Sequence, residues 1–292
     1  GFSFGAVTGS NRAMTDLPDS AAELKRIADA LDRAFPPPVP PADLSAHAAW
    51  RLEDKGLVPV PGFRPLPLDL IVGVDRQRDE IAENLRRHGK GNAAHDMLLW
   101  GVRGTGKSAL VKSAIGHLRE QESLPLTLIE VAGHHIDRLP SLWSELAASG
   151  RRICLYIDDI GYDGADGEAR RVRSMLDGGV EARPENVRLA VTSNQRNIVE
   201  RRGEEQTGAL NERDNQEDAL ALADRFGLKL GFQRPSQDDY LAMVASYASH
   251  FGLEWDRQDA LNFAHQRGGR SGRTAWHFIV EIAGESGTPV GY

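Results

Sequence analysis

The run Gly101-Val102-Arg103-Gly104-Thr105-Gly106-Lys107-Ser108 satisfies the pattern G-x-x-x-x-G-K-[ST]. An apolar run precedes it and an amphipathic helix pattern follows it, which are the flanks that a phosphate-binding loop requires. The glycines let backbone N–H groups surround the β- and γ-phosphates of a nucleotide at the positive N-terminus of the helix. Lys107 neutralises phosphate charge, and the Ser108 hydroxyl is a ligand for Mg²⁺. A chance glycine-rich turn, the alternative, would not need both flanks.

Short apolar runs alternate with helical patterns around this loop. The runs cover residues 97–100, 126–131, 153–157 and 187–191. Continuous apolar runs of this length indicate strands buried on both faces, which is typical of a parallel sheet. The chain after about residue 233 is helical, with expected caps at Ser236 and Asp256 and a third helix from about Gly272 to Ile282. We therefore predict an α/β P-loop core followed by a small helical lid.

Acidic and polar residues follow two of these strands. Asp158 and Asp159 come directly after the third run, where the carboxyl ends of parallel strands meet the phosphate site. Asp158 suits the acid that holds Mg²⁺ through water, and Asp159 suits a carboxylate that orients the attacking water. Thr192-Ser193-Asn194 follows the fourth run, so the Asn194 amide is placed to sense the γ-phosphate. The alternatives are a solvated acidic turn and an ordinary Ser-Asn turn.

These motifs, in this order, resemble the AAA+ ATPases over about residues 68–283. Within Ala223-Asp224-Arg225-Phe226-Gly227, the resemblance implies that Arg225 is an arginine finger that reaches the ATP of a neighbouring subunit. The alternative is a surface ion pair between Arg225 and Asp224. Ser271-Gly272-Arg273-Thr274-Ala275 resembles the second sensor, which implies a γ-phosphate contact from Arg273, with Arg270 as the competing residue.

The resemblance also implies the site as a whole, with ATP and Mg²⁺ as its ligands. Leu70-Ile71-Val72-Gly73-Val74-Asp75 resembles the segment that holds adenine. The implied nucleotide-binding residues are Val72, Gly73, Gly101, Gly104, Thr105, Gly106, Lys107, Ser108 and Ala109. The implied metal-binding residues are Ser108 and Asp158. The implied catalytic residues are Lys107, Asp159, Asn194, Arg225 and Arg273.

A closer resemblance is to an uncharacterised bacterial AAA+ family known as a domain of unknown function. It rests on four pieces of the chain. These are Leu99-Trp100-Gly101, Gly178-Gly179-Val180-Glu181-Ala182-Arg183-Pro184, Thr192-Ser193-Asn194 and Asp224-Arg225-Phe226-Gly227-Leu228. The resemblance implies a fold and a nucleotide, but no established task.

The sequence departs from the AAA+ pattern at two places. Most members carry Glu at the position of Asp159, and the shorter carboxylate predicts slow, switch-like hydrolysis. Asp158-Asp159-Ile160-Gly161 also resembles helicase loaders and transposition helper ATPases. Gly133-His134-His135-Ile136 lacks the aromatic-Gly tip of threading unfoldases, which disfavours protein unfolding. We expect both histidines to be solvated, with a metal or pH role as the alternative.

The N-terminal part of the chain reads as an arm. Ser20 and Glu23 have capping-box spacing, and residues 36–41 form a proline-rich spacer, for packing or for docking a partner. The predicted division is residues 1–13 as an expression scar, 14–66 as the helical arm and linker, 67–232 as the nucleotide-binding α/β domain and 233–292 as the lid. Residues 200–217 are charged and predict a surface loop.

Composition limits the partners. The net charge of −7 disfavours non-specific coating of nucleic acid, and no run approaches a membrane span, so the cytoplasm is the expected location. We expect an ATP hydrolase that self-associates and switches or remodels an unidentified protein partner. The alternative is a DNA-associated loader or recombination helper, suggested by Arg170, Arg171 and Arg173 with nearby Arg183. A small-molecule kinase is disfavoured by Asn194 and the late lid.

Overall fold

The computed structural model describes residues 17–34, 42–161, 167–177, 182–194 and 220–291. Helix α1 (Leu17–Ala34) belongs to a unit of its own, residues 1–41, and the rest of the chain forms the second unit. The helix begins three residues before Ser20, so the expected cap at Ser20 is wrong. Its apolar side chains Leu24, Ile27 and Leu31 are more than half exposed. The predicted spacer at 36–41 and the charged stretch at 200–217 lie outside the described residues.

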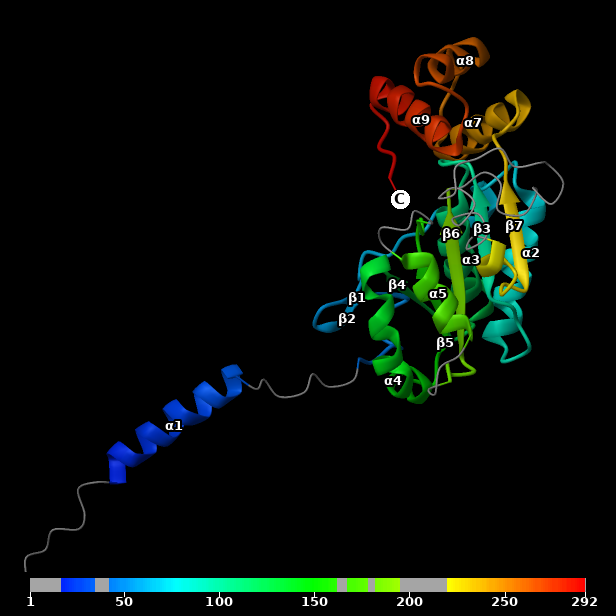
Figure 1. Cartoon of the computed structure of the whole chain (residues 1–292). Coiled ribbons are helices and arrows are strands. Elements are labelled where there is room, and N and C mark those ends of the chain that lie inside the picture. The colour runs from blue at the N-terminus through cyan, green and yellow to red at the C-terminus, as the bar shows by residue number, and fades with distance from the viewer. Residues whose placement is uncertain (1–16, 35–41, 162–166, 178–181, 195–219, 292) are drawn as a thin grey trace, which may run out of the picture. The chain divides into compact units, whose positions relative to one another are not determined.

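The second unit contains a seven-stranded sheet in the order β2-β1-β4-β5-β6-β3-β7 (Figure 1). Its strands are β1 (Ala49–Glu53), β2 (Gly56–Pro59), β3 (Met97–Gly101), β4 (Leu126–Val131), β5 (Arg152–Ile157), β6 (Val187–Ser193) and β7 (Leu228–Phe232). All neighbouring pairs are parallel except the hairpin of β1 and β2. The parallel α/β architecture predicted from the apolar runs is confirmed.

The boundary predicted for the N-terminal arm needs correction. Strand β1 pairs in parallel with β4, with Trp50 opposite Ile129 and Leu52 opposite Val131. Trp50 and Leu52 are buried in the same cluster as the central strands. Residues 49–59 therefore belong to the sheet, because their pairing and burial depend on β4, and the predicted arm of 14–66 is too long.

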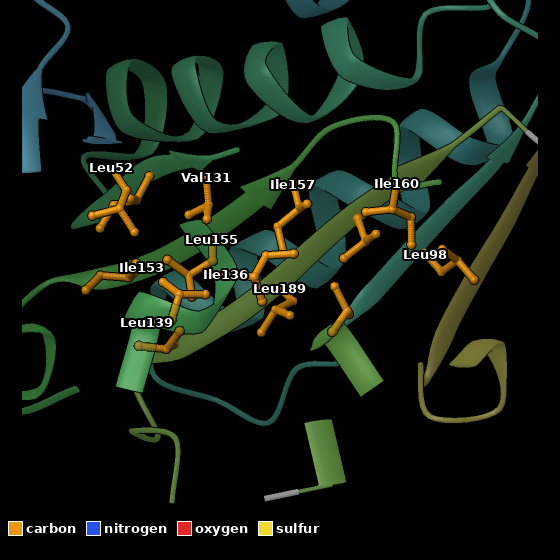
Figure 2. Close-up of a cluster of buried hydrophobic side chains, with 14 of the residues drawn as sticks. Leu52, Leu98, Val131, Ile136, Leu139, Ile153, Leu155, Ile157, Ile160 and Leu189 are labelled. Atoms are coloured by element: carbon orange, nitrogen blue, oxygen red, sulfur yellow. The ribbon is translucent and has the colours of Figure 1, made fainter. Parts of the chain in front are cut away.

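Helices cover both faces of the sheet, which explains why the central strands are apolar throughout. Helices α2 (Asp75–Gly89) and α3 (Lys107–Glu122) pack with one set of strand residues, including Met97 and Leu99. Segment η2 (Gly133–Leu142) and helices α4 (Trp143–Ala148) and α5 (Glu168–Asp177) pack with the alternate set. Figure 2 shows this second cluster, in which Leu155 and Leu189 lie near Ile136 and Leu139 from η2, while Leu98 lies at the other end of the cluster near Ile160. Successive side chains along each strand point to opposite faces of the sheet, so each strand contributes to both hydrophobic clusters.

The lid has a hydrophobic cluster of its own. Helices α7 (Gln237–Phe251), α8 (Arg257–Gln266) and α9 (Gly272–Ser286) surround it, and Leu70 of the short helix η1 (Leu68–Leu70) joins it. The predicted caps of α7 and α8 are confirmed: Ser236 and Asp239 form a capping box, and Asp256 accepts from two backbone N–H groups of α8. No helix in the described ranges is long and apolar enough to cross a membrane.

Candidate functional site

A cavity of about 480 Å³ lies where the carboxyl ends of the central strands meet the lid. Its walls come from the loop before α3, the ends of β5 and β6, the segment before α2, and helices α7 and α9. Of the predicted nucleotide-binding and catalytic residues, it is lined by Val72, Gly104, Thr105, Gly106, Lys107, Ser108, Ala109, Asp158, Asp159, Asn194 and Arg273. Gly73, Gly101 and Arg225 lie outside this lining. Most of the predicted site therefore converges on one cavity, although its residues span much of the sequence.

Close backbone approaches shape the loop from Gly101 to Ser108. Gly101 has φ +129°, and a Cβ there would overlap the carbonyl oxygen of Phe232. That carbonyl also accepts from the Val102 N–H at 3.1 Å, which fastens the loop to β7. Gly106 has φ +93° and forms the N-cap of α3, so the loop runs directly into the helix N-terminus. Glycine is required at these positions because L-residues rarely adopt such angles.

Lys107 is folded into the loop that precedes it. Its buried ammonium group donates to the carbonyl oxygens of Gly101 and Val102, both at 2.9 Å, and to Oδ1 of Asn194 at 3.0 Å. Burial lowers the pKa of Lys107, and the negative charges of Asp159 and Asp158 oppose that shift. Three acceptors match the three hydrogens of an ammonium group, so a phosphate would have to displace one of them.

Asp158 lies at the end of β5 and receives three hydrogen bonds on one oxygen. Oδ1 accepts from Ser108 Oγ at 2.9 Å, from Tyr156 Oη at 2.6 Å and from Thr192 Oγ1 at 2.6 Å. Burial alone would raise the pKa of Asp158, but these bonds outweigh it and the pKa is lowered. Asp158 is therefore an ionised carboxylate beside the Ser108 hydroxyl. The Ser108 hydroxyl donates its proton to Asp158, so its lone pairs are left for a cation. This hard-oxygen pair fits Mg²⁺.

Asp159 sits in an uncommon backbone conformation. Its φ is +53°, and its N–H donates to Thr192 Oγ1 at 2.8 Å. Its carboxylate accepts from Asn194 Nδ2 and from Arg103 Nη2, the latter at 3.3 Å. The Asn194 amide therefore bridges Lys107 and Asp159, because its oxygen accepts from the ammonium group and its nitrogen donates to the carboxylate.

The cavity continues into an apolar wall. Val72, Met243, Tyr247 and Trp276 line it, and the rings of Tyr247 and Trp276 meet edge to face at 5.9 Å. An aromatic and aliphatic wall of this kind suits a planar base. Gly73 lies outside the wall, but its φ of +78° and its closeness to Met243 shape the backbone there.

The lid contacts the phosphate loop directly. The Gly272 N–H donates to the Gly104 carbonyl at 3.1 Å, and a Cβ on Gly104 would lie 3.3 Å from the Ser271 side chain. This contact places Arg273, in the first turn of α9, on the cavity wall. Arg270, the competing residue, is not among the residues that line the cavity.

Arg225 lies on the segment before β7. Its guanidinium binds both carboxylate oxygens of Asp177 at the end of α5, with Nη2 at 2.9 Å from Oδ2, and it also contacts the Ala221 carbonyl. Hydrogen bonding to Asp177 raises the pKa of Arg225. The alternative ion pair with Asp224 is not the contact observed, and the role in a neighbouring subunit stays a prediction.

The expectation that both loop histidines are solvated is wrong for His135. His135 is buried, and its ring nitrogens contact the Leu52 carbonyl at 2.9 Å and Asp54 at 3.0 Å, because β1 packs against η2. Arg183 is paired with Asp96 at 2.7 Å and is mostly buried. Arg171, from the same predicted cluster, bonds the Gly133 carbonyl at 3.2 Å. Arg171 and Arg183, both suggested for nucleic acid, thus have partners inside the chain.

Several residues of the site were not predicted from the sequence. Arg103 occupies a variable position of the phosphate-loop pattern, and Trp276 lies three residues after Arg273 on α9. Tyr156 precedes Asp158 by two residues, so it shares the same side of β5, and Thr192 opens the predicted sensor motif. Two-residue spacing from Asp158 was a usable signal for Tyr156. Nothing local pointed to Arg103.

Comparison with solved structures defines the class of fold. A RuvB variant from Thermotoga maritima matches with a TM-score of 0.51 and 16% identity, over 77% of this chain and 68% of that chain. The ORC1 protein of Aeropyrum pernix, in complex with DNA, matches with a TM-score of 0.51 and 16% identity, over 73% of this chain and 60% of that protein, less than two thirds of its length. The chain has the AAA+ P-loop fold. No curated protein matched the sequence.

A family model matches most of the chain. Residues 44–286 fit the family described as "Protein of unknown function (DUF815)", so the chain belongs to this family. The match begins shortly before β1 and ends at the last residue of α9, so it contains the whole sheet and the lid.

Proposed function

We propose that this chain binds Mg-ATP in the cavity between the sheet and the lid and hydrolyses it slowly, to switch or remodel a protein partner. The observation that carries the proposal is the convergence of Lys107, Ser108, Asp158, Asp159 and Asn194 on one cavity with an apolar wall. A lysine and loop N–H groups suit phosphates, and the wall suits a base. The AAA+ fold supports the same nucleotide.

The reaction is the transfer of the γ-phosphoryl group of ATP to water. Water attacks the γ-phosphorus, the bond to the bridging oxygen of ADP breaks, and phosphate and a proton are released. Lys107 and Arg273 supply positive charge to the phosphoryl group as charge shifts to its oxygens. Asp159 orients the water, assisted by Asn194. When Mg²⁺ is held by Ser108 and, through water, by Asp158, it neutralises phosphate charge.

Slow turnover is expected for two reasons. Asp159 has one methylene fewer than Glu, and a misplacement of about 1 Å can cost roughly 10²-fold in rate. Its carboxylate is also engaged by Asn194 and Arg103, so it must exchange a partner before it orients water. A slow hydrolase with a lid is suited to a switch, because the nucleotide state persists long enough to be read by a partner.

Self-association would complete the site. Arg225 lies outside the cavity of its own chain, which fits a residue that serves the ATP of a neighbouring subunit. Its ion pair with Asp177 is half-exposed and contributes little stability, so in an assembly Arg225 could exchange Asp177 for a phosphate at a small cost in free energy.

A DNA-associated loader is the second candidate. The solved ORC1 protein is in complex with DNA, and α5 carries Arg170 on its exposed side. The internal contacts of Arg171 and Arg183 reduce the basic surface that this role would use. Fluorescence anisotropy with single- and double-stranded DNA separates the two. ATP-dependent binding that weakens with salt would favour the loader.

Phosphate release tests the proposed activity. With Mg-ATP we expect slow turnover that rises with protein concentration and is lost in Lys107→Ala and Asp159→Asn. Asp159→Asn should still bind ATP, so it serves as a bait for the protein partner, with Lys107→Ala as the nucleotide-free control. Turnover that survives both substitutions would assign the activity to a contaminant and reject the proposal.

A further inference from the structure

Arg103 is a cation of the phosphate loop with no role in the pattern that defines the loop. It lines the same cavity as Lys107, and its side chain is 73% exposed. Its Nη2 lies 3.3 Å from Oδ2 of Asp159, 56 residues further along the chain. The guanidinium thus stands between the loop that would cradle the phosphates and the carboxylate that would orient water.

Asp159 cannot easily follow Arg103 if Arg103 moves. Its backbone is held at φ +53° by the bond from its N–H to Thr192 Oγ1, and the next N–H, of Ile160, donates to the Thr192 carbonyl at 2.9 Å. The Asn194 amide holds the other carboxylate oxygen. Arg103 is therefore the mobile member of the pair, and Asp159 is the anchored one.

The pair is also weak enough to exchange. Both side chains are substantially exposed, at 73% and 42%, and exposed ion pairs contribute little because water and salt screen them. The γ-phosphate of ATP carries more negative charge than a carboxylate and offers several oxygens to a guanidinium fork. A γ-phosphate in this cavity would therefore compete for Arg103 successfully, whereas ADP brings no such group.

We propose that Arg103 determines the preference for ATP over ADP, by exchanging its ion pair with Asp159 for the γ-phosphate. This inference rests on the proposed function, because it requires that the cavity bind adenine nucleotides. The exchange also removes one of the two side-chain donors from the Asp159 carboxylate. Asp159 is thus freed for water when ATP is bound and stays engaged when ADP is bound.

Calorimetry with a non-hydrolysable ATP analogue and with ADP, both with Mg²⁺, tests the inference on the full chain. Arg103→Ala should weaken binding of the ATP analogue about tenfold, because the variant loses one charge-assisted contact. Its affinity for ADP should change less than about twofold. Arg103→Lys should fall between, because an ammonium group lacks the fork. Arg87→Ala, which removes an exposed helical ion pair with Glu83 outside the cavity, is the matched control.

The pairing with Asp159 is tested by a double-mutant cycle. Asp159→Asn should bind the ATP analogue more tightly, because it removes the carboxylate that competes for Arg103. This gain in affinity should be smaller when Asp159→Asn is combined with Arg103→Ala. An unchanged preference in Arg103→Ala, or strictly additive effects, would overturn the inference while leaving the proposed function intact. Wild-type protein that binds neither nucleotide would overturn both. Thermal melts of each variant confirm that it is folded.

Discussion

The ammonium group of Lys107 lies 3.0 Å from Oδ1 of Asn194, a contact between residues 87 positions apart. It joins the phosphate loop to the end of β6, and the same amide contacts Asp159 through Nδ2. Asn194 therefore keeps the cation and the carboxylate in a fixed relation. A phosphate that recruited Lys107 would displace one of its three acceptors, and loss of the amide contact would also disturb the bond from Asn194 to Asp159.

Asn194→Ala should separate binding from hydrolysis. Lys107 keeps its two loop carbonyls, so we expect ATP affinity to change only a few-fold, whereas loss of the group that positions Asp159 should slow hydrolysis about 10- to 100-fold. Single-turnover phosphate release and nucleotide calorimetry measure the two effects. An unchanged hydrolysis rate would show that the amide does not act in the reaction.

Gly104→Ala should impair both nucleotide binding and docking of the lid. Gly104 has φ +82°, and the added Cβ would press on Ser271, beside the bond from Gly272. Gly252→Ala is the matched control, because Gly252 also has a left-handed φ, +65°, but has open space around it at the end of α7. Both substitutions should cost about 1 kcal/mol of stability. Only Gly104→Ala should lower the affinity for ATP measured by calorimetry. Equal ATP affinities in the two variants would contradict a role of the contact between Gly104 and the lid in nucleotide binding.

The phosphate loop and the acidic pair could be predicted from sequence because their chemistry is local. Gly101 to Ser108 carries its own flanks, and Asp158 follows a run that is apolar throughout. Strands β1 and β7 were missed because Arg51 and Lys229 interrupt them, and their pairing with β4 and β3 depends on the assembled sheet.

Pairings between distant side chains were beyond reach for the same reason. Arg103 and Asp159 are 56 residues apart, and Arg225 and Asp177 are 48 apart. The sequence allows many possible pairs of an arginine with a carboxylate, and only the tertiary structure determines which of them are in contact. His135 illustrates the reverse error, since a polar run beside a strand predicted solvent exposure, but the β1–β2 hairpin covers it.

Tyr156→Phe should weaken Mg²⁺ binding, so that turnover needs a higher Mg²⁺ concentration. The buried phenol donates to Asp158 at 2.6 Å, and without it the carboxylate loses one of three donors that keep it ionised and oriented. Loss of an outer-shell partner typically costs roughly tenfold in metal affinity. Mg²⁺ titration of ATP turnover measures the shift. Tyr240→Phe, a buried tyrosine of the lid that bonds the Ala260 carbonyl, should leave the Mg²⁺ midpoint unchanged.

Mixing two inactive variants tests the intersubunit role of Arg225. Arg225→Ala keeps an intact cavity, and Lys107→Ala keeps an intact arginine, so mixed assemblies should regain part of the activity. The mixture should release phosphate faster than the sum of its components. If it does not, and light scattering shows a monomer with and without the ATP analogue, the arginine acts in its own chain or not at all.

His88 should make stability depend on pH. It is buried on α2 with Nε2 donating to the Ile153 carbonyl at 3.0 Å, and burial lowers its pKa from 6.5 to about 4. The unfolded chain therefore binds a proton on acidification before the folded chain does. This contribution is complete above about pH 6.5 and is lost as pH falls toward 4, by up to about 3 kcal/mol.

Urea denaturation of wild type and His88→Gln across this range isolates the histidine from the carboxylates that titrate in both proteins. The variant should show the shallower loss of unfolding free energy on acidification. Parallel curves for the two proteins would mean that His88 is not buried in its neutral form.

Whether this cavity binds ATP is decided by calorimetric titration of the full chain with ATP in the presence of Mg²⁺, beside the same titration of Lys107→Ala. We predict one nucleotide per chain for the wild type and no measurable binding for Lys107→Ala, with thermal melts showing that both are folded. Equal ATP binding by the two proteins, or none by the wild type, would contradict the assignment of this cavity to ATP.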